Sequence, residues 1–127
     1  VPYTTLLRSL PELARTNCKH RGFSGTFAVL TAHDPCGRDL SAAENKTRQA
    51  ALENELTADG VHFIRVDACS IDREHCECSV AIAVDQRRAV AIAARYEQMA
   101  IFWYDGEAMW LIGVVVESDP IRLPRSA

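Results

Sequence analysis

The stretch TFAVLTAHDP, residues 26–35, decides the predicted fold, because it joins an apolar strand to a polar turn. Thr26 to Ala32 is rich in β-branched and aromatic residues, which is typical of a β-strand. Asp34-Pro35-Cys36-Gly37 then has the composition of a tight turn. We therefore take this strand as the first strand of a sheet and assign the other elements outward from it.

The segment after this turn carries the clearest helix signal. Ser41-Ala42-Ala43-Glu44 matches a capping box, in which each of the two end side chains accepts a hydrogen bond from the other residue's backbone amide. The helix is predicted to run to about Ala58, because Gly60 is a natural C-terminal stop. The other predicted elements are a short helix over Thr4 to Arg15, which Pro11 could break, strands over Val61 to Val66, Cys78 to Val84, Met99 to Tyr104 and Glu107 to Val116, and a helix over Gln86 to Glu97.

The element order, one helix followed by β-α-β-β-α-β-β, predicts an α+β fold with a mostly antiparallel, ferredoxin-like sheet. In that arrangement the first strand is central, and the third and fourth strands flank it and run antiparallel to it. The fifth strand would lengthen the sheet beside the fourth as an added C-terminal hairpin strand. The 127 residues fit a single domain, 1–127, with an N-terminal helix and loop to residue 25 and a loose tail over residues 117–127.

The C-terminal hairpin gives a second clue. Asp105-Gly106 favours a two-residue type I′ turn, which would pair Phe102 with Met109 and Ile101 with Trp110. Both faces of this hairpin are apolar, whereas a half-exposed antiparallel sheet alternates apolar and polar residues. A second layer must therefore cover the outer face, and either the N-terminal helix or the partner subunit of a homodimer could supply it.

The composition excludes several classes of protein. The formal net charge of −3 at pH 7 argues against a general nucleic-acid binder, which needs a basic surface to displace counterions. No apolar run approaches the roughly 20 residues that span a bilayer, so no membrane partner is expected. The five cysteines are an odd number and no export signal is visible, which predicts reduced thiols and a cytoplasmic location. The sequence contains no nucleotide-binding loop, and no cofactor is predicted.

Polar residues are predicted to converge at the C-terminal end of the first strand. The third and fourth strands, being antiparallel to the first, begin where the first strand ends. Asn45 lies seven residues before Leu52 and so points inward near the start of the long helix, whose N-terminus favours anions. Such a group of polar side chains beside an apolar wall is a candidate ligand site. Its members are Thr31, His33, Asp34, Asn45, Glu77, Ser79 and Gln98.

Each of these residues also has a simpler structural explanation. Asp34 before Pro35 could only initiate a turn, as such residues commonly do. Asn45 could bond the neighbouring loop, Glu77 could satisfy loop amides, and Gln98 could cap the preceding helix. The prediction of a ligand site therefore depends on the group and not on any one residue.

Two further patterns suggest chemistry. Cys69, His75, Cys76 and Cys78 are potential nitrogen and sulfur ligands close together in the sequence, but they lack the two clean Cys pairs of a structural zinc site. Small buried thiols are the alternative explanation. Separately, His33 could act as a general base, Glu77 as a general acid or orienting group, and Ser79 as a nucleophile. No G-x-S-x-G motif supports that hydrolytic arrangement.

Three motifs carry a resemblance to a known family. FAVLTAHDP over residues 27–35, followed by Ser41, Glu44-Asn45 and Arg48, resembles the opening of the bacterial domain of unknown function 3293 (DUF3293) family. Glu77-Cys78-Ser79 is similar to a Glu-Pro-Ser step of that family.

The third motif, Tyr96 to Phe102, resembles the family's Phe-Gly-Gln-x-Ala-Ile-Phe step, and the whole resemblance covers roughly residues 26–112. The sequence departs from the family at His75, where the family usually carries Trp, and at Cys78, where it carries Pro. The family has no established activity, so the resemblance implies a bacterial origin and no particular reaction.

These observations predict a domain that binds a small polar or anionic ligand, or a partner protein, at the C-terminal end of the first strand. One alternative is a small hydrolase or transferase that uses His33 and Glu77, where His33 is the group that naturally titrates near neutral pH. A second alternative is a structural module that dimerises through the C-terminal hairpin.

Overall fold

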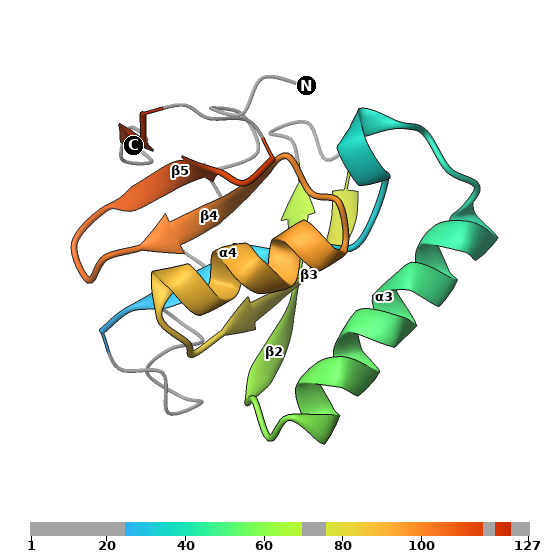
Figure 1. Cartoon of the computed structure of the whole chain (residues 1–127), viewed down its shortest axis with the longest axis horizontal. Helices are drawn as coiled ribbons and strands as arrows, with labels where there is room; N and C mark the ends of the chain where they lie inside the picture. Colours follow the sequence, from blue (N-terminus) through green and yellow to red (C-terminus); the bar gives the residue numbers. More distant parts are fainter. Residues whose placement is uncertain (1–24, 70–75, 116–118, 123–127) are drawn as a thin grey trace.

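A computed structural model describes residues 25–69, 76–115 and 119–122 (Figure 1). The described residues contain two α-helices, one short 3₁₀ turn and six strands. In chain order these elements are β1 (Phe27–Leu30), η1 (Pro35–Gly37), α3 (Ala42–Ala58), β2 (Phe63–Cys69), β3 (Cys76–Ile82), α4 (Gln86–Arg95), β4 (Ala100–Tyr104), β5 (Met109–Gly113) and β6 (Ile121–Arg122). The predicted helix over Thr4 to Arg15 lies outside the described residues.

The strands form one antiparallel sheet in the order β2-β3-β1-β4-β5-β6. β1 lies between β3 and β4 and is antiparallel to both, as the sequence predicts. The complete order differs from the ferredoxin-like one, because β5 and β6 extend the sheet beyond β4. The described residues therefore form an α+β fold with a six-stranded antiparallel sheet and two helices.

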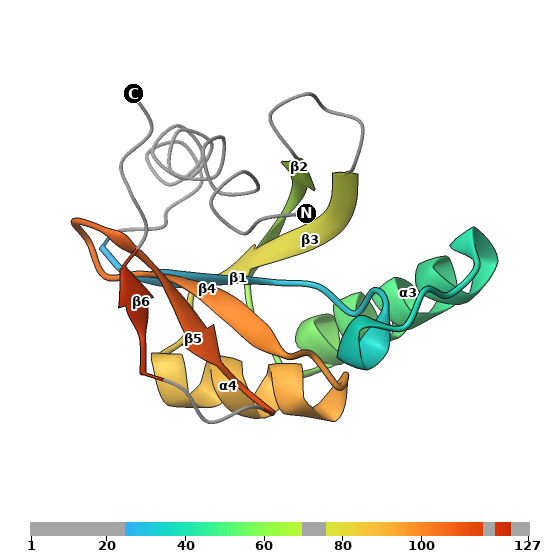
Figure 2. The same cartoon turned by 90° about the horizontal axis from the view of Figure 1, so that it is seen from above.

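Both helices lie on the same face of the sheet, as Figure 2 shows. The capping box at the start of α3 is confirmed: the Glu44 amide donates to the Ser41 hydroxyl (3.1 Å), and the Ser41 amide donates to the Glu44 carboxylate (3.2 Å). Asp85 caps α4 by accepting a hydrogen bond from the Arg88 amide at 2.7 Å. No helix among the described residues has the length and apolar character needed to span a bilayer.

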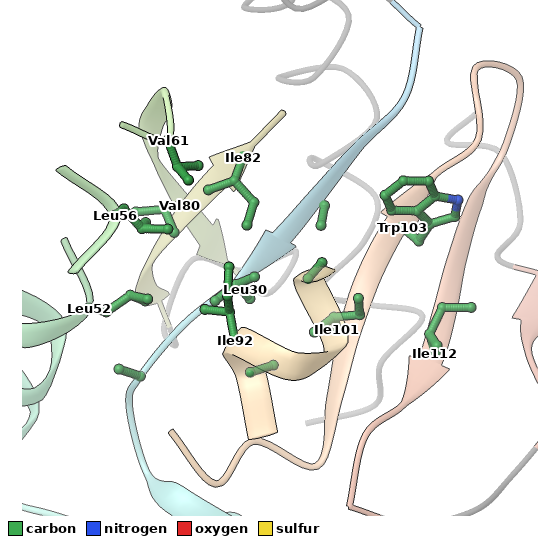
Figure 3. Close-up of a cluster of buried hydrophobic side chains, with 14 residues drawn as sticks. Leu30, Leu52, Leu56, Val61, Val80, Ile82, Ile92, Ile101, Trp103 and Ile112 are labelled. Carbon is green, nitrogen blue, oxygen red and sulfur yellow. The ribbon is translucent and has the colours of Figure 1, made fainter. Parts of the chain in front are cut away.

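A first hydrophobic cluster fills the space between the sheet and the two helices (Figure 3). α3 contributes Leu52 and Leu56, α4 contributes Ile92, and Leu30 of β1 lies at the centre of the sheet. Burying such side chains removes apolar surface from water at roughly 25 cal/mol per Å². This cluster is therefore the main force that holds the helices on the sheet.

A second hydrophobic cluster lies on the opposite face of the sheet, because alternate residues of a strand point to opposite faces. We call this face the second face. Its central residues Phe27 and Val29 are buried, and the Phe27 ring lies 5.1 Å from the Tyr104 ring between centroids. The remaining members are Ile64, Val66, Ala81, Met109 and Leu111, with Ala100 and Phe102 partly buried beside them.

The predicted register of the C-terminal hairpin is wrong. Phe102 pairs with Leu111 and Trp103 with Trp110, so residues 105–108 connect the strands and the Asp105 amide donates to the Ala108 carbonyl at 3.0 Å. The Asp105 carboxylate accepts hydrogen bonds from the amides of Glu107 (2.8 Å) and Ala108 (2.7 Å), which stabilises the longer loop. The register moves by two residues, so each side chain keeps its predicted face, and both faces of the hairpin belong to hydrophobic clusters.

Other strand boundaries also differ from the predicted ones. β2 and β3 continue past their predicted ends toward each other, through Asp67 and Glu77, because backbone pairing tolerates polar residues that an apolar pattern does not count. β1 is shorter than predicted, since the amide of Ala32 bonds a side chain from α3 and leaves the ladder. Ile121 and Arg122 pair with β5 as a short strand, where the sequence predicted part of a loose tail.

The first cluster predicts a large effect of truncating Leu52. Because this side chain is fully buried between α3 and the sheet, we expect Leu52→Ala to lower the free energy of unfolding by about 2–5 kcal/mol. The matched control Val115→Ala, at a side chain that is 49% exposed, should change it by less than about 0.5 kcal/mol. Urea unfolding followed by tryptophan fluorescence measures both, and equal effects would contradict the assignment of the core.

Candidate functional site

Three strands meet at the C-terminal end of β1. β3 and β4 both run antiparallel to β1, so both begin beside the residue at which β1 ends. The β1–β3 register, which pairs Leu30 with Val80, continues to place His33 opposite Glu77. The β1–β4 register continues in the same way to place His33 opposite Gln98. The topology thus brings three of the predicted site residues to one end of the sheet.

Gln98 ties the chain after β1 to the end of α4. The buried Gln98 side chain donates from Nε2 to the carbonyl oxygens of His33 (3.0 Å) and Tyr96 (3.0 Å). Tyr96 is the C-terminal cap of α4, so Gln98 satisfies a carbonyl at a helix end as well as one in the loop. Its position is therefore set by two elements that are far apart in the sequence.

Asp34 and Asn45 form a reciprocal pair that closes the loop after β1 onto α3. Asn45 donates from Nδ2 to Asp34 Oδ1 (2.9 Å), and the Asp34 amide donates to Asn45 Oδ1 (2.9 Å). The Leu40 amide also donates to Asp34 Oδ1 (3.0 Å). Asn45 is buried, as its predicted inward orientation requires. Both side chains therefore have structural partners, and Asp34 Oδ1 already accepts two hydrogen bonds.

Thr31 and Gln49 form further hydrogen bonds at the C-terminal end of β1. The Thr31 hydroxyl donates to the Cys78 carbonyl (2.7 Å), and the Ala32 amide donates to Gln49 Oε1 (3.0 Å). Because a backbone amide can only donate, the Gln49 oxygen must face it and the Nε2 must point away. In the described part of the chain this buried Nε2 has no hydrogen-bond acceptor. Gln49 Nε2 is thus the one buried side-chain donor that the described residues leave unsatisfied.

Ser79 lies beside Thr31 in the extended β1–β3 register but has a different set of contacts. It is buried, and its hydroxyl donates to the Glu77 carbonyl at 3.4 Å. A serine nucleophile needs a base that accepts its proton. Among the residues that the structure describes, no imidazole or carboxylate accepts a hydrogen bond from Ser79.

Arg48 links β1, α3 and α4 with one side chain. Its Nε donates to the Ala32 carbonyl (2.7 Å), and one terminal nitrogen donates to the Tyr96 carbonyl (2.6 Å). The cation also lies at the C-terminus of α4, where the helix dipole favours positive charge. Arg48 therefore serves as a positioning residue for the strand end.

The backbone around the same place adopts an uncommon conformation. Asp34 (φ 46°), Cys36 (φ 52°) and Glu97 (φ 56°) all lie in the left-handed region, which costs free energy for residues other than glycine. The Cys36 amide donates to the Glu97 carbonyl at 2.7 Å, so two of these strained positions hold each other. Packing and hydrogen bonds elsewhere in the fold must offset this cost.

Three titratable side chains shape the electrostatics of the site. Burial, helped by the negative charge of Asp34, raises the pKa of Glu77 above its ordinary value. Burial lowers the pKa of His33, although the charge of Asp34 opposes this. Burial alone would raise the pKa of Asp34, but hydrogen bonds from Asn45 and Leu40 and the proximity of His33 lower it overall. Asp34 is thus held ionised, while Glu77 is pushed toward its protonated form.

The arrangement leaves few groups for an anion. At the start of α3 the Ser41 hydroxyl accepts from the Glu44 amide and the Glu44 carboxylate accepts from the Ser41 amide, so an acidic side chain already lies where a helix could hold an anion. Arg48 donates to two backbone carbonyls, and the exposed Arg38 lies 3.8 Å from the Glu97 carboxylate. The capping carboxylate at this helix N-terminus and the protein partners of both arginines therefore disfavour an anion.

The predicted metal ligands fall mostly outside the described part of the chain. His75 is not described, and for Cys69 and Cys76 only the backbone pairing is, with the two residues opposite each other in the β2–β3 hairpin. Cys78 is exposed and has a free thiol. Within residues 25–69, 76–115 and 119–122, no group of three metal-ligating side chains is close enough to hold an ion.

Comparison with known proteins adds one finding. The profile of the family described as "Protein of unknown function (DUF3293)" matches residues 30–101, which is more than half of the chain. The chain belongs to the DUF3293 family. Neither the curated proteins nor the solved structures gave a match. The DUF3293 match includes every predicted site residue from Thr31 to Gln98, so the hydrogen-bonded closure of β1 lies entirely inside the family region.

Sequence reasoning missed Gln49. The signal was present, because Asn45, Gln49, Leu52 and Leu56 follow one another at spacings of four, three and four and are all buried on the inner face of α3. A polar residue within an apolar stripe indicates a buried hydrogen bond. Arg48 belongs to the family motif, but its contacts with Ala32 and Tyr96 depend on how α3 and α4 sit on the sheet.

The raised pKa of Glu77 predicts how stability depends on pH. Burial in the folded chain favours the protonated form of the Glu77 carboxyl. The ionised carboxylate therefore lowers the stability of the fold, and this loss is absent below the ordinary pKa of 4.5 and complete above the raised pKa of the folded chain. We expect Glu77→Gln to raise Tm at pH 7, with a difference from the wild type that shrinks below pH 4.5. Calorimetry at both pH values measures this. The exposed control Glu107→Gln should change Tm little, and a lower Tm for Glu77→Gln at pH 7 would contradict the argument.

The bridging contacts of Arg48 predict that lysine cannot replace it. A lysine ammonium cannot reproduce the fixed geometry with which the guanidinium reaches two carbonyls. We expect Arg48→Lys to lower the free energy of unfolding by about 1.5–3 kcal/mol, the contribution typical of a hydrogen bond to a charged group. Arg87→Lys, at an exposed arginine, is the matched control, and denaturant unfolding measures the free energy of unfolding of both variants. An unchanged midpoint for Arg48→Lys would show that the bridge contributes nothing to stability.

Proposed function

We propose that this chain binds a small polar ligand at the C-terminal end of β1, and that the ligand donates a hydrogen bond or presents a positive charge to Glu77. One observation supports this more than any other. The Glu77 carboxyl is partly buried near ionised Asp34, and no described residue donates a hydrogen bond to its carboxylate. Placing a second carboxylate there costs free energy, and a donor on a ligand would recover it.

The surroundings of Glu77 support a binding role because they are rigid. Asn45 and Arg48 from α3 and Gln98 from the segment before β4 each bond the backbone of the loop after β1. A turn needs fewer anchors than this, and rigid support is what keeps ligand-binding groups at a fixed geometry. His33 lies within this frame, and its lowered pKa keeps the imidazole neutral at pH 7, able to donate or to accept.

The charges favour a donor or a cation over an anion. Asp34 is held ionised and lies close enough to raise the pKa of Glu77, so the local potential is negative. The Glu44 carboxylate lies at the N-terminus of α3 as part of the capping box, and Arg48 is already bound to two backbone carbonyls. We therefore restrict the expected ligand to the polar class and favour an amine, amidine or amide group as its recognised part.

An NMR titration of the full chain tests this proposal. We expect methylammonium, methylguanidinium or acetamide at millimolar concentration to shift the amide signals of His33, Glu77 and Gln98. Acetate and phosphate, as matched anions, should shift them little. In Glu77→Gln, which removes the acceptor charge, the shifts with methylammonium and methylguanidinium should fall at least several-fold.

The control for this titration is Glu107→Gln, because Glu107 is an exposed glutamate in the hairpin loop. It should respond to the cations as the wild type does. The proposal fails if the anions produce the larger shifts, if none of the probes shifts these signals, or if Glu77→Gln responds like the wild type.

A small hydrolase or transferase that uses His33 and Glu77 is the second candidate. It is supported by the shifted pKa values of both groups, which burial raises for Glu77 and lowers for His33, since perturbed pKa values are common at catalytic sites. The Ser79 hydroxyl donates to the Glu77 carbonyl, so an enzyme of this kind would need a nucleophile other than Ser79 or an activated water. Binding without a reaction therefore accounts for more of the observations.

Dimerisation through the β4–β5 hairpin is the third candidate. Both faces of this hairpin contribute to hydrophobic clusters, and the indole of Trp110 donates to Asp105 Oδ2 at 2.8 Å, which leaves it less suited to a partner. Three broader expectations also stay proposals. A ferredoxin-like relationship is supported by the position of β1 between β3 and β4, a bacterial origin by the motif resemblance, and a cytoplasmic location by the odd number of cysteines.

A further inference from the structure

The second face is more deeply buried than the described elements explain. Phe27, Val29 and Met109 have exposed fractions of only 1%, 2% and 3%. Both described helices lie on the other face (Figure 2). A sheet face with no layer above it leaves its side chains in contact with water, so this face must be covered.

We propose that residues 1–24 of the same chain dock on the second face and supply this layer. The other parts of the chain outside the described residues are 70–75, 116–118 and 123–127. Those segments are too short to cover a surface that extends over five adjacent strands, from Ile64 on β2 to Leu111 on β5. Only the N-terminal segment has enough residues to do so.

The dimensions of the predicted helix fit this surface. Thr4 to Arg15 would form a helix about 18 Å long, at 1.5 Å per residue. Five adjacent strands span about 19 Å between the outer two, at roughly 4.8 Å per strand spacing. One such helix could therefore cross the whole apolar surface from β2 to β5.

The sequence of the segment matches an apolar surface. Its apolar residues recur at helical spacing and share one side of the predicted helix, whereas Arg8, Glu12 and Arg15 lie on the other side. The apolar stripe consists of Leu6, Leu7, Leu10, Leu13 and Ala14. Packing this stripe against Phe102 and its neighbours would remove both apolar surfaces from water at once.

Charge and connectivity favour this segment over a second copy of the chain. Residues 1–24 contain four Lys or Arg side chains and one Glu, a net charge of +3, although the whole chain has −3. Glu77, Ser79 and Ala81 are alternate residues on the same side of β3, and Ala81 belongs to the second face. An acidic side chain therefore lies at the border of the second face. Only Gly25 and Thr26 separate the segment from β1, and this tether makes docking intramolecular and independent of protein concentration.

The decisive experiment uses nuclear Overhauser effects in the full chain. With ¹³C-labelled leucine methyl groups, we expect contacts between the methyls of Leu6, Leu10 or Leu13 and the ring protons of Phe102 and Tyr104. A sample that mixes labelled and unlabelled chains, measured with an isotope filter, should show none of these contacts between different chains. Contacts between chains would assign the layer to a second copy, and no contacts from residues 1–24 at all would equally overturn the proposal.

A pair of variants tests the same contact by stability. Leu10→Asp places a charge in the apolar stripe, and we expect Tm to fall by roughly 5 °C or more with faster hydrogen exchange of the Val29 amide. Thr5→Asp adds the same charge on the polar side of the predicted helix and should change neither. Equal responses of the two variants would contradict docking through the stripe. Glu77 borders the docking surface and also belongs to the ligand site, but the leucine contacts tested here do not involve it, so either proposal can fail without the other.

Discussion

The pairing of β1 along both of its edges is the constraint on which the rest of the structure depends. Phe27–Leu30 is buried along its whole length and is hydrogen-bonded to β3 on one side and β4 on the other. Such a strand cannot slip by one residue, because a slip would exchange its two faces. The fixed register decides which hydrophobic cluster each neighbouring side chain joins. It also brings the beginnings of β3 and β4 to the residue at which β1 ends.

The end of β1 shows how a fold can hold polar groups at a fixed place without a large number of charges. Asn45 and Arg48 come from α3 and Gln98 from the segment before β4, and each bonds the backbone of the same loop. These three side chains bond other groups of the protein, so their role is to hold the loop in place. Glu77 differs from them, because its carboxyl is raised in pKa by burial and by Asp34. Glu77 is therefore the side chain at this end of the sheet whose ionised form is disfavoured by its surroundings.

Much of this arrangement could be predicted from local sequence patterns. The capping box of α3, the inward position of Asn45 and the two apolar faces of the hairpin all follow from short-range periodicity and side-chain chemistry. The hairpin register could not be predicted in the same way, because Asp105 stabilises a longer loop than its Asp-Gly dipeptide indicates. The contacts of Gln49 were also missed, since they require knowing which amide of β1 lies above α3.

The sequence by itself determined the α+β class, the order of the elements and the residues that gather at the end of β1, because these depend on patterns within a few turns or strand lengths. Only the tertiary structure decided which of those polar residues hold the backbone and which one carries the unbalanced charge. The physical reason is that a hydrogen bond or a pKa shift depends on distances between elements far apart in the chain. Those distances are set by how the helices pack on the sheet.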